Sequence, residues 1–278
     1  MTYQELLQQT KQQLLSANKE ERVAELLLMH VSDLDNATLY AQLKETMPDD
    51  QLEEFNRLLI KHIDEDVPLQ HLTRDDVFFG FRFYVNKDVL IPRFETEELV
   101  AKVLAYYDEF FEGDVDVVDL GTGSGAIAIS LVMEEPHMNM TATDVSSAAI
   151  AVANTNADLY DVDIRFLKGS WCEPLIRRYD IVVTNPPYIP DNEELPEMIS
   201  KHEPHLALFG GPDGLDHYRS IFACLPNVVK PKFFVAMEHG KDHKDAIDQL
   251  AKAAFPTAKV WCEKDMQGKD RFTFVYQA

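Results

Sequence analysis

The stretch from Asp114 to Ile129 constrains the fold of this chain more than any other part. A short apolar strand leads into the turn Gly121-Thr122-Gly123-Ser124-Gly125, and a helix of small and branched residues follows. The glycines let the backbone approach a ligand closely, and the helix N-terminus points N–H groups at it. A second strand ends at Asp144, about 20 residues later, where Rossmann-type folds hold ribose hydroxyls. The pattern predicts a nucleotide-type ligand on an α/β sheet.

Strands and helices alternate from Asp114 onward, which indicates a parallel, doubly wound sheet. Because crossover connections are right-handed, the turn after the first strand and the residues after the fourth should lie side by side. That place is the switch point at which such sheets bind ligands. We expect strands near 115–120, 139–144, 163–168, 179–184, 232–238, 258–263 and 271–276, with a hairpin at Gly268.

The fourth expected strand is followed by the tetrapeptide Asn185-Pro186-Pro187-Tyr188. Each proline lacks an N–H donor and biases the residue before it toward an extended backbone. The Asn185 side-chain carbonyl and the Pro186 backbone carbonyl can then accept the two hydrogens of one substrate amide or amine, and Tyr188 can stack on its plane. Two acceptors that favour a pyramidal nitrogen bind the reacting geometry better than the planar ground state. Taken alone, the tetrapeptide equally fits a proline turn that closes a buried strand.

The glycines by themselves do not choose the cofactor, since Gly121 to Ala126 also satisfies the loose pattern for NAD. Asp119, just before the glycines, suits a cationic cofactor that carries an amino acid better than a pyrophosphate. The tetrapeptide favours chemistry on an amine or amide, because hydride transfer does not need it. An NAD-dependent oxidoreductase and a catalytically silent cofactor-binding module stay open as alternatives at this point.

Together, the glycine turn and the tetrapeptide resemble those of amino-methyltransferases that use S-adenosylmethionine. Other blocks are similar to the protein-(glutamine-N5) methyltransferases, and most of all to the release factor glutamine methyltransferases. These blocks are Val89–Val100 (VLIPRFETEELV), Pro68–Thr73, Phe79-Gly80, Glu203–Leu208 and Gly210–Gly214. The resemblance covers about Glu21 to Arg271; Phe94 stands where the family usually has proline, and Ser170 where an aspartate is common.

This resemblance implies a class I S-adenosylmethionine-dependent methyltransferase. Its fold would be an α/β, Rossmann-like seven-stranded sheet with the last strand antiparallel inside it, a small N-terminal helical domain and a connecting β-hairpin. The implied reaction methylates the side-chain nitrogen N5 of the glutamine in the Gly-Gly-Gln motif of peptide chain release factors and leaves S-adenosylhomocysteine. The same chemistry on a ribosomal-protein glutamine, or on a nucleic-acid amine, is the alternative.

The resemblance also suggests roles for individual residues. The cofactor is expected against Gly121, Thr122, Gly123, Ser124 and Gly125, with Asp144 on the ribose hydroxyls and Trp171 beside the adenine. Asn185 would border the methionine end of the cofactor as well as the substrate. Asn185, Pro186 and Tyr188 are the expected catalytic residues, and Pro187 completes the substrate-binding tetrapeptide.

Three domains are expected: a helical substrate-docking domain at 1–75, a β-hairpin linker at 76–92 and a catalytic domain at 93–278. In the first, Leu6, Leu7, Thr10 and Leu14 form the apolar stripe of a helix. A purely structural cap explains these helices as well as docking does. Aromatic residues alternate between Val77 and Val85, and Asn86-Lys87 offers the turn of the hairpin.

The charge and the hydropathy pattern exclude some classes of protein. The formal net charge is −22 and no basic block is present, which argues against a protein that grips nucleic acid through its phosphates. Neither a leader-like N-terminus nor an apolar run long enough to cross a bilayer stands out. We therefore expect a cytoplasmic monomer that acts on a protein and contacts neither membrane nor nucleic acid directly.

The cysteines, several histidines and an acidic residue at the end of a strand are further candidate site residues. The three cysteines, Cys172, Cys224 and Cys262, are far apart and odd in number, so we expect reduced, packed thiols. His202 and His205 have a spacing that a metal could use, as do Asp213, Asp216 and His217, but methyl transfer to nitrogen needs no metal and none is expected. Glu238-His239-Gly240 ends a strand on the ligand side, so it could line the pocket, but we interpret it as a strand end that caps the next helix.

Overall fold

The computed structural model describes residues 1–278, which form two compact units. The smaller unit comprises Met1–Arg74 together with Pro196–His202, and the larger unit comprises Asp75–Leu195 together with Glu203–Ala278. No helix in either unit combines the length and the apolar character that crossing a bilayer requires.

The smaller unit consists of helices that share one apolar core. The expected stripe on its first helix is confirmed, because Leu6, Leu7, Thr10 and Leu14 are all buried. Thr2 starts that helix with a capping box, in which its hydroxyl accepts the N–H of Glu5 while the Glu5 carboxylate accepts the N–H of Thr2. The helices are α1 (Tyr3–Ser16), α2 (Arg22–Ser32), α3 (Asn36–Ala41), α4 (Asp49–Asp64), α5 (Leu69–Thr73) and α9 (Glu197–His202).

A two-stranded hairpin opens the larger unit. Strands β1 (Asp75–Phe78) and β2 (Phe81–Tyr84) pair antiparallel around Phe79-Gly80. The hairpin therefore turns at Phe79-Gly80 and not at Asn86-Lys87, where a separate turn follows β2 and the N–H of Val89 donates to the Asn86 carbonyl at 3.3 Å. Both Phe79 and Gly80 adopt positive φ, which gives the backbone twist that a two-residue hairpin needs.

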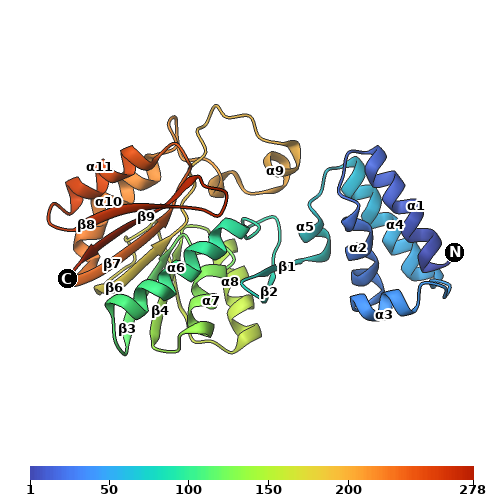
Figure 1. Ribbon diagram of the computed structural model, residues 1–278, viewed down its shortest axis with the longest axis horizontal. Helices are drawn as coiled ribbons and strands as arrows, with labels where there is room; N and C mark the ends of the chain where they lie inside the picture. Colours follow the sequence, from blue (N-terminus) through green and yellow to red (C-terminus); the bar gives the residue numbers. More distant parts are fainter. The chain divides into compact units, whose positions relative to one another are not determined.

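The main sheet of the larger unit has seven strands in the order β5-β4-β3-β6-β7-β9-β8 (Figure 1). Strands β3 to β7 are parallel, whereas β9 runs antiparallel between β7 and β8, as the resemblance implied. The expected seven-stranded α/β fold is confirmed. The strands are β3 (Val115–Leu120), β4 (Met138–Asp144), β5 (Arg165–Lys168), β6 (Tyr179–Thr184), β7 (Val229–Glu238), β8 (Lys259–Lys264) and β9 (Asp270–Gln277).

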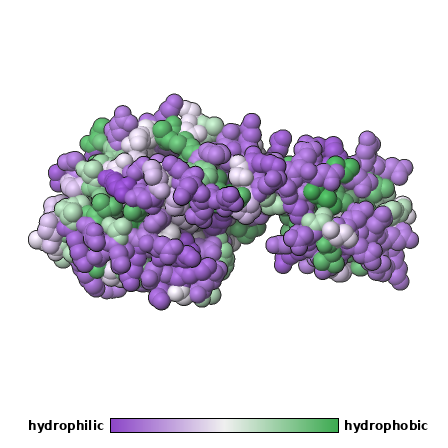
Figure 2. Space-filling view, turned by 90° about the horizontal axis from the view of Figure 1, so that it is seen from above, coloured by the Kyte–Doolittle hydropathy of each residue, from purple (hydrophilic) through white to green (hydrophobic).

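Helices cover both faces of this sheet because its central strands are apolar on both sides. Val117 and Val183 face one core, which contains residues of α6, α7 and α8, while Val118 and Val182 face a second core with α10 and α11. Where Figure 2 shows the larger unit, hydrophilic side chains dominate its outer surface. The helices are α6 (Phe94–Phe110), α7 (Ala126–Glu134), α8 (Ser147–Tyr160), α10 (Asp216–Val228), α11 (Lys244–Ala254) and a 3₁₀ turn, η1 (His205–Ala207).

One disulfide links the second core to the segment after β5. Cys172 and Cys224 are bonded, with 6.0 Å between their Cα atoms, and only Cys262 is a free thiol. The expectation of three reduced thiols was wrong. The two partners are 52 residues apart in sequence, and they meet only because α10 packs beside the turn that carries Cys172.

Register brings the two motifs together at the carboxyl ends of the central strands. β3 pairs with both β4 and β6, and Leu120 at the end of β3 lies opposite Thr184 at the end of β6. Gly121 and Asn185, the next residue on each strand, therefore start adjacent loops. The expected switch point lies between β3 and β6.

Candidate functional site

A cavity of about 440 Å³ lies at the carboxyl ends of β3, β4 and β6. This volume is in the range of small-molecule sites. The cavity wall includes eight of the residues expected from the sequence, which are Gly121, Thr122, Gly123, Ser124, Asp144, Trp171, Asn185 and Pro187. Three expected residues, Gly125, Pro186 and Tyr188, are not part of that wall.

The glycine turn is held against the end of β4. The N–H groups of Gly121 and Thr122 both donate to the carbonyl of Thr143 at 2.9 Å. Gly121 has a φ of +76°, and a Cβ added there would lie 3.0 Å from Cζ3 of the Trp171 indole. Only glycine therefore combines this backbone conformation with the close approach of the ring.

Gly125 has a different task from the other glycines of the turn. It caps α7 in a left-handed conformation with φ +82°. A Cβ at this position would lie 3.0 Å from Cδ1 of Ile129 and 3.2 Å from Cβ of Ala153. Gly125 thus allows α7 and α8 to pack closely and does not face the cavity.

The carboxylate of Asp144 is fixed by backbone donors at the cavity wall. One oxygen accepts the N–H of Gly123 at 2.9 Å and the other accepts the N–H of Ser146 at 2.8 Å. Burial raises the pKa of Asp144, and these backbone hydrogen bonds counteract part of that effect. The carboxylate is held ready to accept hydrogen bonds from a ligand.

Trp171 forms the part of the wall next to the glycine turn. Its backbone is left-handed, with φ 48°, and its carbonyl accepts the Thr143 hydroxyl at 3.1 Å. Its indole lies 5.2 Å from the ring of His217 on α10. Trp171 and Gly121 together form a flat, apolar surface on which a planar group can lie.

Asp119 is fully buried behind the glycine turn and is not part of the cavity wall. Neither carboxylate oxygen has a hydrogen bond of good geometry. Burial raises its pKa to about 7, and the neighbouring Thr122 and Ala128 offset only part of this cost. The cationic end of a cofactor in the cavity would therefore be separated from Asp119 by the glycine turn and would interact with its carboxylate only across that turn.

The tetrapeptide turns its first residue toward the cavity. Asn185 donates from Nδ2 to the hydroxyl of Thr96 at 3.0 Å, and Pro187 completes the wall. Pro186 between them is buried. The ring of Tyr188 packs against the second core, and burial raises the pKa of its hydroxyl to about 12. The structure brings Asn185 to the cofactor residues, whereas Tyr188 is not part of the cavity wall.

Thr96 had no predicted role and Glu238 was interpreted as a strand end, but both lie close to Asn185, and Thr96 is part of the cavity wall. Thr96 lies in the first turn of α6 and donates its hydroxyl to the Glu238 carboxylate at 2.7 Å. The interpretation of Glu238 as a helix cap was wrong, because α11 begins at Lys244 with His243 in the N-cap position. Thr96 lies inside the block that carries the resemblance, but nothing local in the sequence pairs it with Glu238.

An ion pair fixes another part of the wall. Arg93 donates to Glu203 at 2.5 Å, and the N–H of Ile91 donates to the same carboxylate at 3.2 Å. The Glu203 side chain is buried, so the pair ties the segment before α6 to the segment before η1. Arg93 and Pro204 then take part in the cavity wall.

The histidines that could suggest a metal are engaged elsewhere. His202 Nε2 lies 2.8 Å from the carbonyl of Glu65, and His217 Nε2 lies 3.1 Å from the carbonyl of Phe209. No group of three or more His, Cys, Asp or Glu side chains has an arrangement that could hold a metal ion.

Comparisons with known proteins agree with these observations. The Methyltransferase small domain model matches residues 99–210, and the PrmC N-terminal domain model matches residues 5–73. The release factor glutamine methyltransferase of Bacillus subtilis is 41% identical over 274 residues, covering 96% of this chain and 95% of that protein. The enzyme of the same name from Bacillus cereus is 36% identical over 263 residues, covering 92% and 93%.

Solved structures with low identity support the fold alone. A methyltransferase from Pyrococcus furiosus superimposes with a TM-score of 0.53 at 15% identity, covering 82% of this chain and 98% of that one. The 16S rRNA N2 G1207 methyltransferase of T. thermophilus, in complex with AdoMet and guanosine, gives a TM-score of 0.54 at 13% identity, covering 73% and 50%.

Proposed function

The chain belongs to the release factor glutamine methyltransferase family, and from this premise we propose that it methylates the Gly-Gly-Gln glutamine of peptide chain release factors on its side-chain nitrogen N5. The observation that carries the proposal is the position of Asn185. Its side chain shares one cavity wall with the glycine turn, so a donor and an amide acceptor can meet there.

The residues of the wall fit S-adenosylmethionine, the cofactor of this family. The absence of a side chain at Gly121 lets the Trp171 indole pack against the glycine turn in the cavity wall, where its ring would border the adenine. The Asp144 carboxylate, oriented by two backbone N–H groups, is placed to accept the ribose hydroxyls. Thr122 lies in the wall with its hydroxyl buried beside the Asp119 carboxyl, and we assign this polar group to the cofactor's amino-acid end.

The residues of the tetrapeptide would orient the glutamine amide. When bound, S-adenosylmethionine supplies a sulfonium methyl group, so that a carbon–sulfur bond breaks while a carbon–nitrogen bond forms and the amide loses one proton. Asn185 Oδ1 and the Pro186 carbonyl would accept the two amide hydrogens and so hold the nitrogen in line. Pro187 forms the adjacent wall. Tyr188 would support the tetrapeptide from the core side and reach the substrate only if its ring turned.

Asn185→Ala tests this assignment in the full-length protein. We expect turnover on purified release factor to fall by about 100-fold or more, since the reacting nitrogen loses its orienting acceptor. The affinity for S-adenosylmethionine, measured by calorimetry, should change only a few-fold. Asn154→Ala, an exposed asparagine on α8, is the matched control. Full activity of Asn185→Ala would remove the proposed role.

Mass spectrometry of the product tests the substrate. The methyl group should be found on the Gly-Gly-Gln glutamine, and a release factor with Gln→Asn at that position should give no signal. Methyl groups on ribosomal proteins or nucleic acid, in parallel reactions, would instead support the alternatives. The net charge of −22 is unfavourable for a nucleic-acid substrate.

We further propose that residues 1–75 dock the release factor, that 76–92 link the domains and that 93–278 carry out catalysis. The match of a separate family model to residues 5–73 supports an independent role for the helices. Cross-links between this segment and the release factor in the full-length complex would test it; cross-links confined to 93–278 would refute it.

We also propose that the protein is a cytoplasmic monomer, because release factors act there on free ribosomes. The Cys172–Cys224 disulfide is more typical of oxidising compartments. Cell fractionation and light scattering of the purified protein test the compartment and the oligomeric state.

A further inference from the structure

At the cavity wall, the hydroxyl of Thr96 contacts Asn185, and the buried carboxylate of Glu238 lies behind it. Glu238 ends β7 and Thr96 lies in the first turn of α6; they are 2% and 5% exposed. The Thr96 hydroxyl donates to Glu238 Oε2 at 2.7 Å, and Asn185 Nδ2 donates to Thr96 Oγ1 at 3.0 Å. The Asn185 amide also lies close enough to Glu238 to stabilise its charge directly.

When Glu238 is ionised, the donors and acceptors of Glu238, Thr96 and Asn185 allow only one pattern of hydrogen bonds. A carboxylate only accepts, so the single hydroxyl hydrogen of Thr96 must point at it. The Thr96 oxygen can then only accept, and the side-chain nitrogen of Asn185 must face it. The carbonyl oxygen Oδ1 of Asn185 is thereby turned away from this row of three residues.

We propose that Glu238 and Thr96 are positioning residues, which lock the side-chain amide of Asn185 with Oδ1 presented to the substrate nitrogen. This inference rests on the proposed function, in which Oδ1 accepts an amide hydrogen of the glutamine. Without these two hydrogen bonds, the Asn185 amide could turn by 180° and present its NH2 group to the substrate. An NH2 group is a donor, so it cannot accept a hydrogen from the substrate amide.

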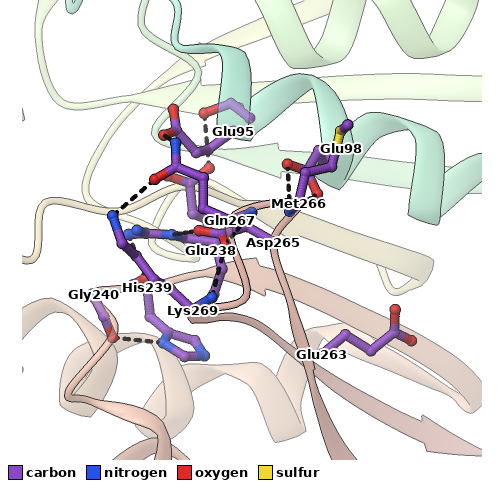
Figure 3. Close-up of polar contacts among 12 residues, drawn as sticks. Glu95, Glu98, Glu238, His239, Gly240, Glu263, Asp265, Met266, Gln267 and Lys269 are labelled. Carbon is purple, nitrogen blue, oxygen red and sulfur yellow. Dashed lines mark hydrogen bonds and ion pairs between the residues drawn. The ribbon is translucent and has the colours of Figure 1, made fainter.

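Contacts from a neighbouring turn stabilise the helix start that carries Thr96, the middle residue of the row Glu238, Thr96 and Asn185. The turn between β8 and β9 contacts the start of α6, where the N–H of Met266 donates to both carboxylate oxygens of Glu98 at 3.1 and 3.2 Å (Figure 3). The Gln267 side chain donates to Glu95 at 3.4 Å, also visible in Figure 3. Since Glu95 directly precedes Thr96, these contacts limit the movement of the Thr96 hydroxyl.

The protonation state of Glu238 decides in which direction the hydrogen bonds between Glu238, Thr96 and Asn185 run. Burial raises its pKa to about 7. A protonated Glu238 becomes a donor, and the Thr96 hydroxyl can then donate to Asn185 Oδ1 instead, so activity should fall as the pH falls through this pKa. The charged or titratable groups that act on Glu238 from neighbouring elements are Arg271 of β9, Glu95 of α6, Tyr188 after β6 and Tyr218 of α10.

The first test compares two substitutions of Thr96, to Val and to Ser, with the control Thr141→Val. Thr141 is a fully buried threonine of β4 whose hydroxyl accepts from Arg177 at 3.1 Å, and it lies outside the cavity wall. With full-length release factor and S-adenosylmethionine, we expect kcat of Thr96→Val to fall about 100-fold. Thr96→Ser should restore most of it, and calorimetry should show a nearly unchanged Kd for S-adenosylmethionine in all three.

The pH profile of kcat in Glu238→Gln is the second test. Wild type should lose activity below the pKa of Glu238, while the variant, which cannot titrate there, should lack that limb. A Thr96→Val enzyme as active as Thr141→Val, or a Glu238→Gln profile that keeps the limb, overturns the positioning role. If the wild type itself does not methylate release factor, the proposed function fails instead, so the two failures can be told apart.

Discussion

Asp119→Asn should change how the stability of this protein depends on pH. The Asp119 carboxylate is fully buried, neither oxygen has a good hydrogen bond, and its pKa is raised to about 7. In the unfolded chain an aspartate has a pKa of about 3.9. Between these two values the folded state holds a proton that the unfolded state has released.

The sign of the effect follows from that proton. Because the native state binds more protons, the free energy of unfolding falls as the pH rises from about 4 to about 7 and then levels off. Each pKa unit corresponds to about 1.4 kcal/mol, so the contribution of Asp119 should fall by about 3 kcal/mol between about pH 5 and pH 8. The amide that replaces the carboxylate in the variant does not titrate, so its own contribution stays constant.

Urea unfolding of both proteins across this pH range measures the difference. Glu238 also has a raised pKa, but it titrates in both proteins and cancels in the difference. Asp144, whose charge contributes to raising the Asp119 pKa, cancels only in part. A constant offset from burying the new amide, about 1–3 kcal/mol, leaves the slope unchanged. Asp163→Asn, at an exposed position, should give a flat difference. Parallel curves for wild type and Asp119→Asn would refute the argument that this carboxylate resists ionisation.

Two other substitutions test the packing around the cavity. Gly121→Ala and Gly113→Ala should each lose about 1–2 kcal/mol in urea unfolding from left-handed strain. Only the first also pushes on the Trp171 ring 3.0 Å away, so calorimetry should show weaker S-adenosylmethionine binding for it alone; equal binding by both would contradict this. Asn156→Ala removes the partner of three backbone groups in the hairpin and glycine turn and should cost about 3 kcal/mol or more, whereas exposed Asn154→Ala should cost little.

The parts of the fold that sequence alone predicted are those with a local cause. The run Val115 to Leu120 has valine or leucine side chains on both faces, and it forms a central strand because helices cover both faces. The glycine turn and the tetrapeptide each follow such a strand. Handedness of the crossovers then suffices to bring Gly121 and Asn185 together, as the pairing of Leu120 with Thr184 confirms.

The errors concern choices that depend on distant packing. Phe79-Gly80 and Asn86-Lys87 were both possible turns, and the hairpin uses the first, where Phe79 also donates its N–H to Glu97 of α6. Spacing likewise could not reveal the Cys172–Cys224 bond, because a helix from later in the chain supplies the second sulfur. Tyr188 packs against the second core, and its contact with the substrate stays a prediction.

Glu238 shows what kind of reasoning could have gone further. A carboxylate at the end of the apolar strand Phe233–Met237 is bound to be buried, since the strand lies between β6 and β9. A buried acid is costly without donors, so a donor had to be sought among residues at the same edge of the sheet. Thr96 lies 142 residues away, yet it belongs to a helix whose first turn lies at the end of β7. At the edge of the sheet where the two motifs meet, only a few hydroxyls and amides can donate a hydrogen bond to a buried carboxylate. The Asn185 amide is one of them.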